Sequence, residues 1–157
     1  MATALTTDEI YERYLKKAIT EINRLSHEIA QAADGAPTAL PTGHPLASIF
    51  LLKYGPQAQE LQEGVAFHGR AGNALIKSLG RLHVDPMEVY GTNCVKFAGA
   101  DMETCRAWLR RELMRGGVLQ SHFAATYPLE RITEAVTHAT SVGKGGKVIL
   151  RIGERGA

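Results

Sequence analysis

The apolar run from Ala47 to Tyr54 constrains the fold more than any other segment of this chain. It has the length of one β-strand and is nearly unbroken by polar residues, which is typical of a strand covered on both faces. Two further strand patterns, over 88–97 and 147–152, alternate with helix patterns along the sequence. We therefore predict an α/β fold, in which a small parallel sheet of three or four strands is flanked by helices.

The longest predicted helix occupies residues 6–33. Its apolar residues recur at alternating intervals of four and three: Tyr11, Leu15, Ala18, Ile22, Leu25 and Ile29. Thr6 and Glu9 form a capping-box pattern at its start, and Gly35 lies where the helix should end. Because the stripe is narrow, we expect the helix to pack along one seam of its own domain. A homodimer through this helix is the less favoured alternative.

A chain of 157 residues has the length of one domain, so we expect the remaining patterns to join the same core. A turn-rich connector occupies 34–45, and a polar loop is expected over 55–64. Further helices are predicted from Gly69 to about Leu82, from Asp101 to about Arg115, and from Pro128 to about Ala139. We divide the domain into the long helix, a core over 44–115 and a helix–strand tail over 118–153.

Composition excludes several classes of protein. Eighteen basic and sixteen acidic residues give a net charge of +2, which by itself indicates neither a nucleic-acid nor a membrane partner. Two cysteines, Cys94 and Cys105, are too few for a disulfide scaffold or a four-thiolate metal site and are typical of small buried hydrophobes. No apolar run is long enough to span a bilayer, and early acidic residues argue against a signal peptide. We expect a soluble, cytoplasmic protein.

The segment from Val65 to Val84 contains no acidic residue but three basic ones, and glycines bracket the turn that opens its helix. Such a turn offers free backbone N–H groups and the positive end of a helix dipole, which suit a phosphate. The candidate phosphate-binding residues are Gly69, Arg70, Gly72, Lys77 and Arg81. The alternative is a tight strand-to-helix turn with a solvated basic face.

Asn93 stands near the end of the second predicted strand. A buried amide is costly unless it finds hydrogen-bond partners, and open parallel sheets bind ligands beyond the carboxyl ends of their strands. A carboxamide both donates and accepts, so Asn93 can bind the polar edge of a nucleobase. The alternative is an asparagine that ties down an adjacent loop.

Three motifs lie within about residues 44–113: EGVAFHGRAG at 63–72, VYGTNCVK at 89–96 and ETCRAWL at 103–109. In their order and spacing they resemble the uracil-DNA glycosylase superfamily, most closely its family 4 and the related actinobacterial-type branch. The resemblance implies a truncated version of that family's three-layer fold and a DNA-repair hydrolase of N-glycosyl bonds that acts on uracil in DNA. It also implies that Phe67 stacks on a flipped uracil and that Asn93 hydrogen-bonds its Watson–Crick edge.

The chain departs from the family pattern at both of its catalytic motifs. The water-positioning Gly-Glu-Ala-Pro-Gly motif is replaced by Lys-Tyr-Gly-Pro-Gln at 53–57, and no His-Pro-Ser motif follows Leu113. Uracil excision is therefore expected to be weak or absent, with His68 as the one candidate catalytic residue that could compensate. The family's iron–sulfur cluster needs four cysteines, so neither a cluster nor any other cofactor is expected.

The tail over 118–153 resembles the last helix and strand of medium-chain quinone oxidoreductases, on the segments 127–135 and 145–152. In that family the tail carries no catalytic residue, and this chain lacks the glycine-rich nicotinamide fingerprint. We expect a structural role for the tail. Two alternatives to a glycosylase-like protein stay open: a non-catalytic binding or interaction module of the same fold, and an oxidoreductase fragment without activity of its own.

Overall fold

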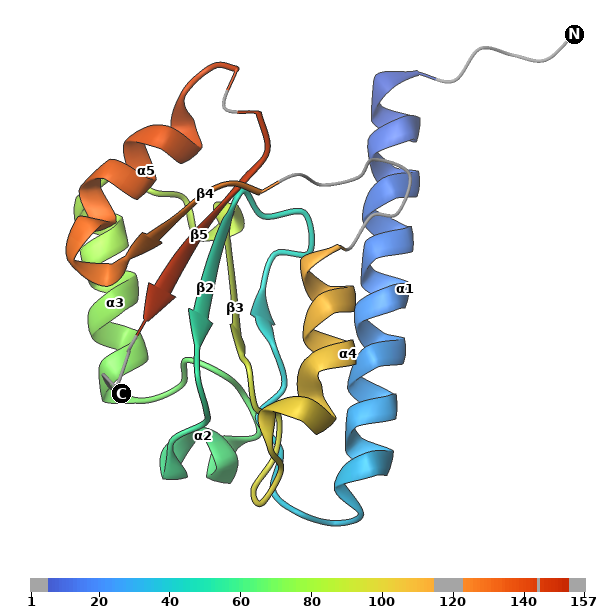
Figure 1. The fold of residues 1–157 in the computed structure, drawn as a ribbon. Helices are drawn as coiled ribbons and strands as arrows, with labels where there is room; N and C mark the ends of the chain where they lie inside the picture. Colours follow the sequence, from blue (N-terminus) through green and yellow to red (C-terminus); the bar gives the residue numbers. More distant parts are fainter. Residues whose placement is uncertain (1–5, 115–122, 144, 153–157) are drawn as a thin grey trace, which may run out of the picture.

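The computed structural model describes residues 6–114, 123–143 and 145–152, and it contains one five-stranded sheet (Figure 1). The strand order is β1–β3–β2–β5–β4, and β2, β3, β4 and β5 run parallel, whereas the two-residue β1 runs antiparallel to β3. The strands are β1 (Thr42–Gly43), β2 (Ile49–Lys53), β3 (Val89–Asn93), β4 (Phe123–Pro128) and β5 (Lys147–Ile152). The predicted α/β class with a mostly parallel sheet is confirmed, but the sheet has five strands where three or four were predicted.

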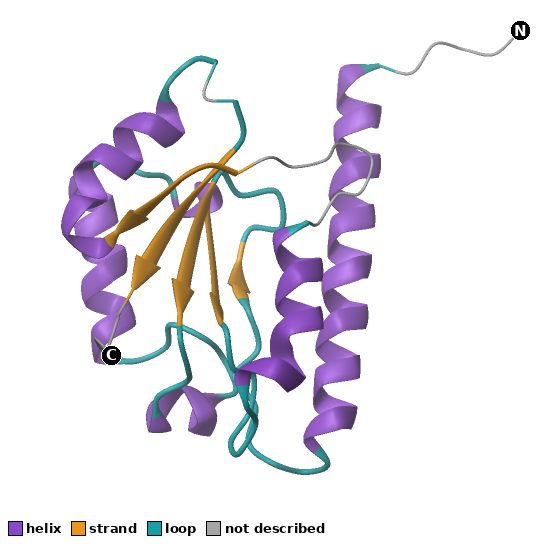
Figure 2. Ribbon diagram, in the orientation of Figure 1, coloured by secondary structure: helices purple, strands orange, loops and turns teal. Residues whose placement is uncertain are grey.

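Helices cover both faces of the sheet, which gives three layers (Figure 2). Helices α3 and α5 lie on one face, and α1 and α4 lie on the other (Figure 1). The helices are α1 (Thr7–Ala33), α2 (Ala58–Glu63), α3 (Arg70–Arg81), α4 (Met102–Leu113) and α5 (Ile132–Thr140), with 3₁₀ turns η1 (Pro86–Glu88) and η2 (Leu129–Arg131). The long amino-terminal helix and the helix that follows Gly69 are therefore both confirmed.

The side chains of each strand alternate between the two faces. On the α3/α5 face the sheet residues form a cluster with Leu79 of α3 and Ala135 and Val136 of α5; these sheet residues are Ile49, Leu51, Val89, Val148 and Leu150. On the α1/α4 face, Phe50, Tyr90 and Ile149 form a second cluster, against which Ile22 and Leu113 pack. Because β5 lies between β2 and β4, the carboxyl-terminal helix and strand complete the same core.

Helix α1 begins with the predicted capping box, since Thr6 and Glu9 bond to each other's backbone and side chain. It ends at Asp34, which adopts a left-handed conformation. From Ala18 onward the predicted apolar stripe is buried except for the partly buried Ile22, whereas Tyr11 is 52% exposed. The expectation that α1 packs on its own domain is confirmed for this later part, and the amino-terminal part of α1 extends past α4 (Figure 1).

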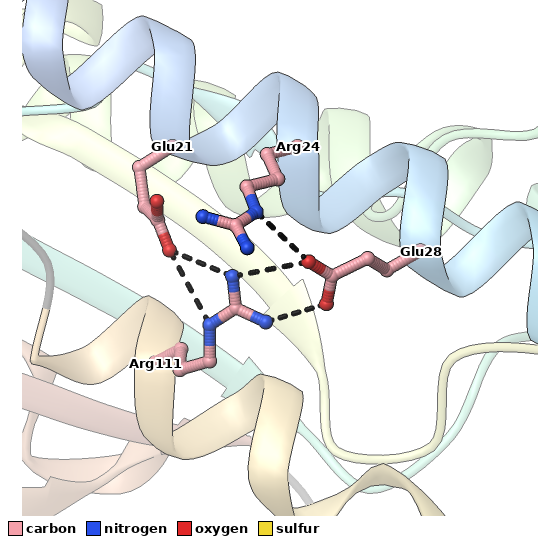
Figure 3. A network of polar contacts seen from close by, with 4 residues as sticks. All are labelled: Glu21, Arg24, Glu28 and Arg111. Carbon is pink, nitrogen blue, oxygen red and sulfur yellow. Dashed lines mark hydrogen bonds and ion pairs between the residues drawn. The ribbon is translucent and has the colours of Figure 1, made fainter.

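A charged network joins α1 to α4 (Figure 3). Arg111 of α4 donates to Glu21 at 2.8 Å and to Glu28 at 2.5 Å, and Arg24 donates to Glu28 at 3.2 Å. The hydrogen bond from Arg111 lowers the pKa of Glu28 and raises the pKa of Arg111. Because these side chains remain accessible to water, the network contributes more to the orientation of the two helices than to stability.

Several predicted boundaries were wrong. The connector over 34–45 contains β1, and the loop over 55–64 contains α2. The strand predicted over 88–97 starts after η1 and ends at Asn93, because the backbone beyond it turns to bond Tyr54 and then Pro37. The helix predicted from Pro128 starts at Ile132, since Pro128 still belongs to β4. The predicted end of α4 near Arg115, and residues 118–122 of the tail, lie outside the described residues.

Candidate functional site

The candidate site begins with the backbone of Phe67, which has a φ of 59°, an unusual value for a residue other than glycine. Its N–H donates to the carboxylate of Glu60, and its carbonyl lies against Gly72 of α3 so closely that a Cβ there would overlap it. Gly69 forms the helix N-cap with a φ of 100°. The predicted glycine-bracketed turn at the start of a helix is confirmed, and Gly72 allows Phe67 to approach that helix.

The aromatic ring of Phe67 lies over β3. A Cβ placed on Gly91 would stand 2.6 Å from Cδ2 of Phe67, so the missing side chain of Gly91 leaves the space that the ring occupies. The ring also packs against the cluster on the α3/α5 face. Phe67 is therefore held over the middle of β3, on the face of the sheet that α3 covers.

Asn93 is the last residue of β3, two positions after Gly91, so its side chain points to the same face as the Phe67 ring. The residue is 0% exposed, yet neither Nδ2 nor Oδ1 finds a hydrogen-bond partner among the described residues. A buried amide without partners costs about 1–3 kcal/mol. The structure thus places the two predicted base-binding residues on one face, with an unused donor and acceptor beside the ring.

Lys53 completes this group from the neighbouring strand, where it lies in direct register with Asn93. Paired residues of adjacent strands point to the same face, and Lys53 Nζ lies 5.4 Å from the centroid of the Phe67 ring. The Lys53 side chain is 17% exposed, so this end of the face reaches solvent at Lys53.

Glu60 of α2 connects the residues of the candidate site. Its side chain is only 1% exposed and accepts three hydrogen bonds. The donors are the Lys53 ammonium, the Gln57 N–H at 2.6 Å and the Phe67 N–H. One buried carboxylate thus fixes both the turn that carries Phe67 and the direction of Lys53. Sequence reasoning missed both charged residues, since Glu60 lies in a segment predicted as loop and Lys53 looks like the polar end of a strand.

The three basic residues predicted to bind phosphate lie along α3. Arg70, Lys77 and Arg81 are spaced by seven and four residues, which places them in one exposed row opposite the buried Gly72 and Leu79. In the part of the chain that the structure describes, none of the three forms an ion pair. The row is available for phosphates, although its binding to them stays a prediction.

His68 follows Phe67 and is exposed on the segment that leads into α3. Within the described residues its ring makes no hydrogen bond, so its proposed catalytic role stays a prediction. Cys94 and Cys105 are buried free thiols, and burial raises the pKa of each. They are therefore the small buried hydrophobes that the sequence predicts.

No group of three or more histidine, cysteine, aspartate or glutamate side chains is placed to hold a metal ion in the ranges that the structure covers. No helix in those ranges combines the length and the apolar character needed to cross a membrane.

Comparison with known protein families finds no family model that matches this chain, and comparison with curated proteins finds no matching relative. The candidate site must therefore be interpreted from its own geometry and from the motifs of the sequence.

Proposed function

We propose that this chain is a uracil-DNA glycosylase-like protein that binds a flipped uracil-type base in DNA and excises it weakly or not at all. The observation that carries the proposal is the buried, unpartnered carboxamide of Asn93 beside the Phe67 ring. A carboxamide with a free donor and a free acceptor suits an adjacent carbonyl and N–H of a base, and an aromatic ring supplies a surface for its face. If Asn93 only held an adjacent loop in place, its amide would form hydrogen bonds to that loop.

Weak excision is proposed because neither of the family's two catalytic motifs is present in this chain. Cleavage of the bond to the sugar needs a positioned water and stabilisation of the departing base, each worth about 10²–10⁴-fold in rate. Where the family has its water-positioning carboxylate this chain has Tyr54, which is 65% exposed. The carboxyl-terminal tail is proposed to have a structural role. The supporting observation is that β5 pairs with β2 inside the sheet.

The first prediction tests the base-binding role of Asn93. The protein should bind an oligonucleotide that contains uracil more tightly than the same strand with an abasic analogue at that position. Asn93→Ala should reduce this preference by roughly tenfold to a hundredfold, because one two-bond contact to a base edge is worth about 1–3 kcal/mol. A fluorescence binding titration measures both affinities, and a uracil-release assay on the same samples measures excision.

Asn73→Ala is the matched control, since Asn73 is an exposed asparagine of α3, and it should leave the preference unchanged. Equal affinity of the unmodified protein for the two strands would contradict base binding and favour a non-catalytic interaction module. Uracil release at a rate typical of active glycosylases would contradict the proposed loss of catalysis, and His68→Ala is then the first variant to measure.

A second prediction concerns the basic row on α3. If Arg70, Lys77 and Arg81 each neutralise one phosphate of duplex DNA, their joint replacement by alanine should reduce the slope of log K against log salt by roughly 2.7. Replacement of the exposed Arg13, Lys16 and Lys17 of α1 by alanine removes the same charge and should change the slope little. If both triple variants change the slope equally, DNA binding depends on the net charge of the protein and not on the basic row of α3.

A further inference from the structure

We infer that Lys53 binds the second carbonyl oxygen of the base and stabilises the negative charge that the base gains when its bond to the sugar breaks. This inference rests on the proposed function, and it assigns to Lys53 a direct contact with the base.

The positions of the two side chains carry the inference. Lys53 and Asn93 stand side by side on neighbouring strands, and such strands lie about 4.8 Å apart. A uracil ring carries two carbonyl oxygens on either side of one N–H. When the amide of Asn93 binds the N–H and the carbonyl farther from the sugar, a donor on the adjacent strand can face the other carbonyl, which is next to the nitrogen bonded to the sugar.

The ammonium group has hydrogen-bonding capacity left for that oxygen. A lysine ammonium carries three N–H donors, and among the described residues Nζ makes one hydrogen bond, to Glu60. Glu60 also accepts hydrogen bonds from the backbone N–H groups of Gln57 and Phe67, which hold its carboxylate in place. The carboxylate therefore keeps the Lys53 ammonium in one position. Lys53 also lies near the Phe67 ring, on which the base would stack.

During cleavage of the bond to the sugar, negative charge develops on the carbonyl oxygen of the base that faces Lys53. When the bond between the base nitrogen and the sugar carbon breaks, its electron pair leaves with the base and spreads onto the neighbouring carbonyl oxygen. The oxygen of a water molecule forms the new bond to the sugar carbon, and the proton that this water loses later neutralises the base. Lys53 keeps its own proton throughout, and a fixed positive group beside a developing anion lowers the barrier.

The experiment measures binding of free bases, so it does not depend on excision. Uracil and 5-fluorouracil are titrated into the full chain at several pH values, with chemical shifts or heat as the readout. Fluorine makes the base acidic enough to lose its proton while lysine stays charged. We expect the affinity for 5-fluorouracil to rise by about tenfold as the base ionises, from its attraction to a nearby cation.

Lys53→Met should abolish this rise and weaken the binding of neutral uracil by no more than about tenfold, through the loss of one hydrogen bond. Lys53→Arg should retain the rise. Since Lys53→Met leaves the buried Glu60 carboxylate without its cation, the double variant Lys53→Met/Glu60→Gln is made beside it and should behave alike. Lys17→Met, on the exposed surface of α1, is the matched control and should respond as the unmodified protein does.

The same pH response in the unmodified protein and in both variants without Lys53 would overturn the inference and leave base binding standing. Failure of the unmodified protein to bind either base at any pH would instead overturn the proposed function, and the inference with it. The two failures are therefore distinguishable.

Discussion

Replacement of Lys96 by methionine is expected to reduce the free energy of unfolding by about 3–5 kcal/mol, because it leaves a buried carboxylate without its cation. Lys96 and Glu112 are both 0% exposed, and Lys96 Nζ lies 2.5 Å from Oε2 of Glu112. Thr92 joins the pair, since its hydroxyl accepts from Lys96 at 2.6 Å and donates to Glu112 at 3.0 Å. The three side chains connect β3 and the segment after it to α4.

Denaturant unfolding of Lys96→Met, Glu112→Leu and the double variant measures this effect. The double variant should recover much of the lost stability, because two apolar side chains can fill the space without burying a charge. Arg106→Met is the control, since Arg106 pairs with Glu103 in solvent and should change stability little. A Lys96→Met protein as stable as the original would show that water reaches Glu112.

The sheet and most of its helices could be predicted because their signals are local. The apolar run that begins at Ala47 contains β2, and the pattern over 147–152 coincides with β5. The caps at Thr6 and Asp101 start α1 and α4 as expected, since each side chain bonds the backbone three residues later. Such bonds depend on neighbours in sequence and leave a recognisable spacing.

The elements that were missed depend on tertiary contacts. The two residues of β1 have no strand pattern of their own and are held by β3. Helix α2 has one turn and a half, and its Glu60 is buried because Lys53 and the Phe67 backbone need a common acceptor. A buried glutamate cannot be recognised from spacing when two of its partners come from other segments of the chain.

In the candidate site, too, some residues could be predicted from local motifs and others depend on tertiary contacts. Phe67 and Asn93 were predicted from motifs, and the structure places them on one face because Gly91 leaves space for the ring. The register of β2 against β3, which brings Lys53 beside Asn93, depends on the pairing of residues that are forty positions apart in the sequence. Register of this kind is fixed by the packing of both faces rather than by either strand alone.

Replacement of Gly72 by alanine is expected to reduce the free energy of unfolding by about 3 kcal/mol or more, which is at or above the usual cost of overpacking. An ideal Cβ on Gly72 would overlap the carbonyl oxygen of Phe67, and both atoms belong to elements that are fixed at several points. The clash is with backbone, so a change of side-chain rotamer cannot relieve it. Either α3 moves away from β3, or Phe67 leaves its left-handed conformation and loses its bond to Glu60.

Gly80 provides a control within the same helix. Nothing lies within 4 Å of its Cβ position, so Gly80→Ala should stabilise the protein by about 0.5–1 kcal/mol through better helix propensity. A decrease in the free energy of unfolding for Gly72→Ala and an increase for Gly80→Ala would show that Phe67 is positioned by the space at Gly72 and not by glycine content. Gly72→Ala should also weaken the binding of uracil-containing DNA in protein that remains folded, because the ring no longer lies on Gly91 beside Asn93. A Gly72→Ala protein with unchanged stability would mean that Phe67 does not approach α3 as closely as this structure places it.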